Sequence, residues 1–103
     1  EVEVLSTPSM IAFMERTALQ CVEEYLPKEY TTVGFRIDIK HLKPAPIGAK
    51  IKVEAKLVEV NDRKLVFQVK AFWKGLLIGE GIHERYIVNR IKFLEKIKSL
   101  MKQ

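Results

Sequence analysis

Several features that would restrict the function of this 103-residue chain are scarce or missing. The sequence holds a single cysteine, Cys21, so no disulfide can form within it. No apolar run approaches the roughly 20 residues that span a bilayer, and no charged and then apolar leader is visible. We therefore expect a cytoplasmic protein with one domain, residues 1–103, and no membrane partner.

The sequence also lacks the short motifs that mark common kinds of chemistry. It contains no glycine-rich phosphate loop, no CxxC pair, no HExxH and no GxSxG. Its two histidines, His41 and His83, lie far apart and have no cluster of other metal-ligand residues at known spacing. We therefore expect no metal site and no cofactor.

The net charge of +5 raises the question of a nucleic-acid partner, because lysine and arginine bind phosphates. The lysines are interleaved with apolar and acidic residues, as in KIKVEAKLVEV and KFLEKIKSLMK. This pattern is typical of the solvated faces of strands and helices. We expect no nucleic-acid partner, and the mild positive field would equally suit a small phosphate-bearing substrate such as a coenzyme A ester.

Hydrophobic periodicity predicts two helices that flank a run of strands. Thr7 followed by Pro8 predicts the N-cap and first position of a helix that runs to about Tyr25. Residues 10–14 are apolar on every side, which predicts a core helix wrapped by other structure. A second amphipathic helix is predicted over residues 91–100.

Between the helices, three segments alternate apolar and polar residues with a period of two, which predicts strands. The first ends near Pro44, and the others cover about residues 50–57 and 65–73. A fourth strand is expected over about residues 76–88, where the pattern does not define which residues face the helix. NDRK and the pair Lys74 and Gly75 predict turns, and Gly79 and Gly81 predict a bulge or a close approach of backbones. The face that the first strand turns to the helix is predicted to carry Val33, Phe35, Ile37, Ile39 and His41.

This order of elements predicts an α+β architecture in which an antiparallel sheet wraps around one long central helix, followed by a C-terminal helix. A sheet whose inner face holds one long helix is the hot-dog arrangement. It leaves sheet edges open, and such edges are usually paired with a second copy. We therefore expect a homodimer or a higher homo-oligomer.

Three polar residues stand in apolar settings. Glu15 lies four residues after Ile11 and three before Ala18, so it falls within the helix stripe that faces the sheet. Burying an unpaired carboxylate costs on the order of several kcal/mol, unless Glu15 bends to the helix flank and pairs with an arginine or lysine. His41 ends the inner strand face, and Thr7 lies about two helical turns from Glu15. A purely structural role is also open for both residues. His41 would be a strand-end histidine bonded to backbone, and Thr7 would be a helix cap.

Three segments, TPSMIAFMERTA, VGFRIDIKHLKPAPIG and EGIHERYIV, resemble the hot-dog fold acyl-CoA thioesterases that are similar to fluoroacetyl-CoA thioesterase. The resemblance extends over nearly the whole chain, from Val4 into the last helix. The order and spacing also agree, with a hydroxyl residue eight before Glu15 and a histidine 26 after it.

The resemblance implies an enzyme that hydrolyses an acyl-CoA thioester at a site on a dimer interface. By this resemblance, the family's catalytic residues correspond to Thr7, Glu15 and His41. Its substrate-binding residues correspond to Gly34 and Arg85. In these roles Glu15 can act as a base on water or attack the thioester directly. His41 can bind the leaving sulfur or orient the carboxylate, and Thr7 can hold the carbonyl or position the attacking group. Both routes stay open at this point.

The identity of the hydroxyl residue, the acyl selectivity and the function each have an alternative. Ser6, directly before Thr7, offers a second hydroxyl for the same role. The fluoroacetyl-specific relative carries an aromatic lid ahead of its threonine, and the six residues before Thr7 hold no such segment, so we do not expect selectivity for a fluorinated acyl group. The alternative function is a non-catalytic acyl-CoA binding or regulatory module. A hydratase would need an Asp and His segment that is not found, and a structural dimerisation domain would bind no ligand.

Overall fold

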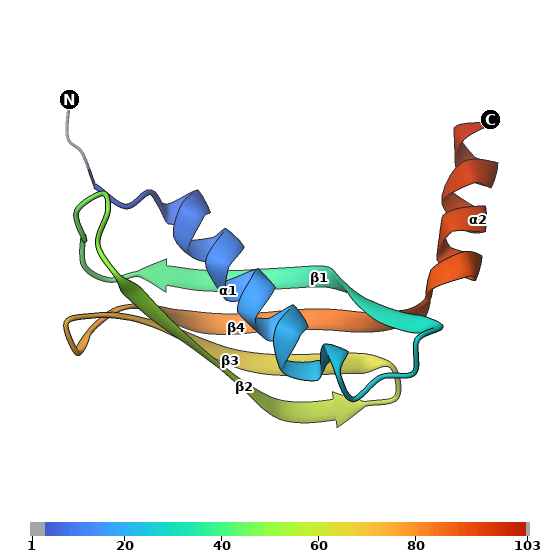
Figure 1. The fold of residues 1–103 in the computed structure, drawn as a ribbon, viewed down its shortest axis with the longest axis horizontal. Coiled ribbons are helices and arrows are strands. Elements are labelled where there is room, and N and C mark those ends of the chain that lie inside the picture. The colour runs from blue at the N-terminus through green and yellow to red at the C-terminus, as the bar shows by residue number, and fades with distance from the viewer. Residues whose placement is uncertain (1–3, 103) are drawn as a thin grey trace.

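The computed structural model describes residues 4–102, in which four strands form one antiparallel sheet. The elements are α1 Thr7–Glu23, β1 Tyr30–His41, β2 Ile51–Asn61, β3 Lys64–Trp73, β4 Leu76–Asn89 and α2 Arg90–Met101. The strand order across the sheet is β1-β4-β3-β2. Helix α1 lies across one face of the sheet (Figure 1). The predicted α+β architecture and its order of elements are confirmed.

The first helix is capped by Ser6. The backbone of Ser6 is extended, with φ −75° and ψ 149°, and its Oγ accepts a hydrogen bond from the backbone N–H of Ser9 at 3.2 Å. The expectation that Thr7 is the N-cap is therefore wrong by one residue. Thr7 is the first helical residue and Pro8 the second, where the missing N–H still costs no hydrogen bond. The hydroxyl of Thr7 is consequently not needed to cap the helix.

Helix α1 packs on the sheet through one stripe of side chains. The buried members of this stripe are Met10, Met14, Ala18 and Val22. They pack against the buried residues of β3, which are Leu65, Phe67, Val69 and Ala71. The spacing of four residues places the helical stripe on one side, and the spacing of two does the same for the strand. Ala12 and Phe13, which made this helix apolar all round in the sequence, are exposed in the single chain.

A β-bulge interrupts the pairing of β1 with β4. Gly34 pairs with Arg85 and Arg36 pairs with Glu84, so Phe35 has no partner in β4. An extra residue of this kind bends the strand and reverses the facing of the residues before it. The bulge lies close to the middle of β1, and Gly34 beside it faces Glu15 of α1.

This bulge corrects one predicted facing. Phe35 is 63% exposed, whereas Gly34 beside it faces Glu15 of α1. The expectation that Val33 and Phe35 share the inner face with the second half of β1 is therefore wrong. A period of two assumes that every residue has a partner, and the extra residue at the bulge breaks that assumption.

The glycines of β4 allow close packing, as the sequence predicted. A Cβ on Gly81 would collide with the backbone carbonyl oxygen of Asp38 in β1. A Cβ on Gly79 would stand 2.6 Å from Sδ of Met10 in α1. These two positions therefore let β1 and the first half of α1 approach β4 closely.

The second predicted helix is confirmed as α2. It follows the N-cap Asn89, whose Oδ1 accepts a hydrogen bond from the backbone N–H of Lys92 at 3.0 Å. Helix α2 projects away from the end of the sheet (Figure 1), and none of its residues is buried in the single chain. Between residues 4 and 102, no helix has both the length and the apolar character that crossing a membrane requires.

Candidate active site

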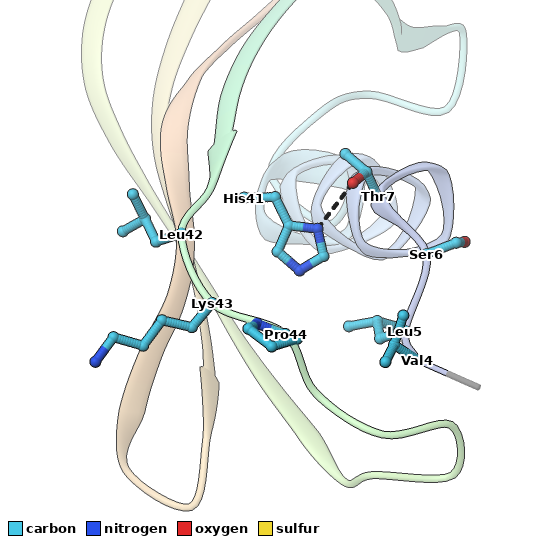
Figure 2. A pocket seen from close by; sticks show the side chains of 8 residues that line it. All are labelled: Val4, Leu5, Ser6, Thr7, His41, Leu42, Lys43 and Pro44. Carbon is cyan, nitrogen blue, oxygen red and sulfur yellow. Dashed lines mark hydrogen bonds between the residues drawn. The ribbon is translucent and has the colours of Figure 1, made fainter. Parts of the chain in front are cut away.

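Thr7 and His41 meet where α1 begins and β1 ends, although 34 residues separate them. Oγ1 of Thr7 lies 2.8 Å from Nδ1 of His41. Figure 2 shows the Thr7 hydroxyl turned towards the imidazole ring and the Ser6 side chain turned away from it. Ser6 Oγ instead donates to Oγ of Ser9 at 2.8 Å while it caps the helix. Thr7 rather than Ser6 is thus the hydroxyl that contacts the histidine.

The second ring nitrogen of His41, Nε2, is buried and makes no hydrogen bond within the described chain. A buried polar atom without a partner costs about 1–3 kcal/mol, so native structures contain few of them. His41 lines a cavity of about 390 Å³ together with residues 4–7 and 42–44 (Figure 2). A ligand in this cavity can supply the missing hydrogen bond.

Glu15 lies beside the β1 bulge and not beside His41. It is half-buried, and none of the ion pairs found within residues 4–102 includes it. Glu15 Oε2, Arg85 Nη1 and His83 Cε1 lie 3.3, 3.6 and 3.6 Å from the point that a Cβ on Gly34 would occupy. The missing side chain of Gly34 therefore leaves space between a carboxylate and a guanidinium. A cavity of about 170 Å³ opens there, lined by Glu15, Gly34, His83 and residues 35–37.

Arg85 is held in place by three hydrogen bonds. Its Nε donates to Thr32 Oγ1 at 2.8 Å, and its Nη2 donates to the Thr32 carbonyl at 2.9 Å. Its Nη1 donates to Nε2 of His83 at 3.1 Å. Burial lowers the pKa of the Arg85 guanidinium, and the nearby carboxylates of Glu15 and Glu23 act in the opposite direction. Arginine stays protonated in proteins, so a fixed positive charge lies close to Gly34.

His83 completes this cluster, although no sequence pattern predicted it as a site residue. It is only 1% exposed, and its Nδ1–H donates to the backbone carbonyl of Arg36 at 2.8 Å. Burial is the largest cause that lowers its pKa, and the charge of Arg85 lowers it further, while the Arg36 carbonyl and Glu15 raise it. The spacing of His83 and Arg85 by two in a strand is a signal that they share a face. The glycines earlier in β4 obscured that signal.

The structure thus groups the predicted site residues into two sets. Thr7 and His41 form one set at the end of β1, and Glu15, Gly34 and Arg85 form the other at the bulge. The rise of α1 separates Thr7 from Glu15 by about 12 Å. Within residues 4–102, no group of three His, Cys, Asp or Glu side chains is placed to hold a metal ion.

Comparison with solved structures identifies the class of fold. A hot-dog-like protein from Thermanaerovibrio acidaminovorans superposes with a TM-score of 0.89 and 23% sequence identity, over 94% of this chain and 72% of that one. A likeness at this identity concerns the fold alone. The architecture is that of a hot-dog domain, as the sequence predicted.

The family follows from closer relatives. The family model of the fluoroacetyl-CoA-specific thioesterases matches residues 1–91, and the chain belongs to that family. The fluoroacetyl-CoA thioesterase of Streptantibioticus cattleyicolor is 31% identical over 96 residues, which cover 93% of this chain and 69% of the relative. A variant of the fluoroacetyl-CoA-specific thioesterase, solved with fluoroacetate and CoA, is 30% identical with a TM-score of 0.88, over 93% of this chain and 75% of that one. The resemblance seen in the sequence is confirmed.

Proposed function

We propose that the chain hydrolyses the thioester bond of an acyl-coenzyme A to give the free acid and coenzyme A. Membership of a thioesterase family supports this proposal, as does the solved relative that holds fluoroacetate and CoA. The main structural support is the 2.8 Å contact between Thr7 Oγ1 and His41 Nδ1, at the edge of a cavity that both residues line. The other ring nitrogen of His41, Nε2, is buried and has no hydrogen-bond partner in the described chain.

The residues suit the demands of thioester hydrolysis. The reaction needs an oxygen nucleophile for the carbonyl carbon and a hydrogen-bond donor for the leaving sulfur. Glu15 takes a proton from water, the hydroxide adds to the carbonyl carbon, and the C–S bond breaks. In the tautomer that this role requires, the Thr7 hydroxyl donates to His41 Nδ1, and Nε2 carries a proton and binds the departing thiolate. The proton held by Glu15 then passes to that thiolate, which regenerates the carboxylate.

Direct attack by Glu15 is the second route that the same geometry allows. Its oxygen would bond to the carbonyl carbon, the thiolate would leave, and water would cleave the resulting anhydride. A single turnover in ¹⁸O-labelled water tests the routes. Label in the Glu15 side chain, detected by mass spectrometry of its peptide, indicates direct attack followed by water addition at the Glu15 carbonyl carbon. Label found only in the released acid fits the water route and also an anhydride opened at its acyl carbon, and a Glu15 hydroxamate formed with added hydroxylamine then marks direct attack.

We infer that two copies of the chain build each site. Strand β1 lies at one edge of the sheet formed within residues 4–102, so one row of its backbone groups is free to pair. In this arrangement β1 pairs in the antiparallel direction with β1 of a second copy, and a two-fold axis passes through Asp38. Residue 36 of one copy then lies opposite residue 40 of the other. The extra residue Phe35 then brings Gly34 opposite His41. This arrangement joins Thr7 and His41 of one copy to Glu15 of the other.

A cysteine at the proposed axis tests this pairing. Cα atoms of directly opposed residues in antiparallel strands lie about 4.5–5.5 Å apart, within the range that a disulfide spans. In a chain whose Cys21 is replaced by alanine, Asp38→Cys should give a covalent dimer on mild oxidation, seen on a non-reducing gel. Glu24→Cys, at an exposed helix end, is the matched control. Equal crosslinking of both variants would contradict the axis.

Mixed dimers test whether the site is shared. Glu15→Gln and His41→Ala chains are each expected to be inactive, and neither contains a complete site. Random exchange of equal amounts should restore about a quarter of the native activity, because half of the dimers are mixed and each holds one intact site. Activity that stays at the level of the separate variants would place the whole site within one chain.

The size of the cavity at the bulge favours a short acyl group. Within one chain the cavity at the bulge measures about 170 Å³, less than half of the cavity beside His41. We therefore propose a substrate with a short acyl chain.

A panel of acyl-CoA esters, from acetyl to dodecanoyl, tests the function directly. Release of free thiol, followed with a colorimetric reagent, should give the highest kcat/KM with the shortest chains. Calorimetric binding without any release across the panel would instead favour the non-catalytic acyl-CoA binding module.

A further inference from the structure

We propose that His83 is a positioning residue for the reacting carboxylate. Its neutral ring ties the β1 bulge to the Arg85 guanidinium, and this keeps Arg85 from closing a salt bridge onto Glu15. The inference rests on the proposed function, because it takes Glu15 to be the reacting group. The mechanism described above needs only Thr7, His41 and Glu15, and so leaves His83 without a role.

His83 connects the β1 bulge to Arg85 through its two ring nitrogens, and the first contact is at the bulge. Nδ1–H of His83 donates to the backbone carbonyl of Arg36, which follows the extra residue Phe35. A bulge leaves backbone groups that the regular ladder no longer pairs, and a buried side chain that bonds to one of them holds the bulge in place. Because Gly34 faces Glu15 only as a result of the bulge, His83 helps to maintain that facing.

The second contact of the His83 ring is with Arg85. Arginine has only donors, and histidine accepts a hydrogen bond only in its neutral form, so the 3.1 Å contact from Nη1 to Nε2 requires a neutral His83. Nδ1 carries the ring proton, which agrees with its bond to the Arg36 carbonyl. The two bonds to Thr32 and the one to His83 fix the plane of the guanidinium.

The orientation of Arg85 matters because Glu15 is so close. Both Glu15 Oε2 and Arg85 Nη1 lie within 3.6 Å of the position of a Cβ on Gly34, yet the two groups form no ion pair in the described chain. An Nη1 that lost its acceptor on His83 would turn to the carboxylate, the strongest acceptor nearby. That bond would occupy the lone pairs that Glu15 needs to take a proton from water.

Two substitutions of His83 separate positioning from packing. His83→Phe keeps a ring of similar shape beside Phe67, whose centroid lies 6.4 Å away, but removes both nitrogens. His83→Gln offers an amide N–H and a carbonyl oxygen with about the spacing of the two ring nitrogens. We expect His83→Phe to lower kcat about tenfold or more with KM changed less than about threefold, and His83→Gln to recover most of that loss.

Nitrogen NMR gives a readout that does not depend on turnover. The Arg85 Nη1–H signal should be alike in the native protein and in His83→Gln, and shifted in His83→Phe, where Nη1 turns to Glu15. The His83 ring nitrogens should show the tautomer protonated at Nδ1. The groups that face this ring are Arg85 of β4, Glu15 of α1 and the Arg36 carbonyl of β1.

Ile82→Phe is the matched control, because it adds the same ring at the next residue of β4, where the side chain is 36% exposed. Its kcat should stay within about twofold of the native value. If His83→Phe fails to fold, Thr32→Val, which removes one acceptor of Arg85, should lower kcat in the same direction.

Native kcat in His83→Phe, or an unchanged Arg85 signal in that variant, overturns the positioning role. Equal loss in the phenylalanine and glutamine variants with a native Arg85 signal also overturns it. Absence of turnover in the native protein removes the proposed function instead, and the Arg85 signal then still decides whether His83 holds the guanidinium.

Discussion

At the end of β1, Thr7 and His41 share one hydrogen bond beside an open cavity, whereas at the bulge Arg85 makes three hydrogen bonds while only 7% exposed. The first region keeps a buried nitrogen without a partner in the described chain, and the second satisfies its arginine within the protein. An unsatisfied donor or acceptor is suited to meet a ligand, and a satisfied charge is suited to hold a fixed field. In the function proposed above, the two regions supply complementary parts of one reaction.

The largest expected effects come from removing one reacting group in each region. Glu15→Gln and His41→Ala should each lower kcat roughly a hundredfold or more, because general acid and base groups contribute about that much. Thiol release from a short acyl-CoA measures the rate, and circular dichroism with light scattering checks fold and assembly. Glu24→Gln, at an exposed position of the same chain, is the control. A large loss in only one region would show that the other region is structural.

A smaller effect is expected at the hydroxyl pair that opens α1. Thr7→Val should lower kcat about tenfold, since it removes the partner of His41 Nδ1 while keeping the shape, and Thr7→Ser should retain most of the rate. Ser6→Ala should instead lower the free energy of unfolding by about 1 kcal/mol through loss of the cap. Urea denaturation and initial rates, measured on all three variants, separate the two roles. A greater rate loss in Ser6→Ala than in Thr7→Val would reassign the hydroxyl.

Gly34→Ala probes the space at the bulge. The added Cβ would lie 3.3 Å from Glu15 Oε2, a tight contact, while Gly34 has no positive φ that would strain an alanine. We expect a normally folded protein whose KM for the best acyl-CoA rises about fivefold, with a greater effect on longer acyl chains. Steady-state kinetics over the acyl panel measures this change. An unchanged chain-length profile would move the acyl group away from the bulge.

The smallest expected effect is on stability at acid pH. Because burial lowers the pKa of His83 below its ordinary value of 6.5, the folded chain binds fewer protons there than the unfolded chain. The contribution of His83 is therefore fully present above about pH 6.5 and is lost as the pH falls towards the lowered pKa. Urea denaturation between pH 7 and pH 5 should show a shallower decline for His83→Gln than for the native protein. Parallel declines would indicate that His83 is protonated equally in both states.

Much of the fold was predictable because it follows from local patterns. A period near 3.6 predicted α1 and α2, a period of two predicted β1, β2 and β3, and turn residues predicted the hairpins. Asp62, Lys74 and Gly75 adopt the positive φ values that tight hairpin turns require. The spacing of Thr7, Glu15 and His41, read through the family resemblance, also led to residues that line the two cavities.

The order of helices and strands, the stripe that α1 buries and the residue types that can act on a thioester are properties of the amino-acid order, because they depend on neighbours within a few positions. Tertiary pairing alone brought Thr7 to His41. It also placed the bulge at Phe35 and joined His83 to the Arg36 carbonyl. These features depend on contacts between residues 34 or more positions apart, or on a residue that has no partner in the neighbouring strand. The periodicity of the local sequence contains no information on either.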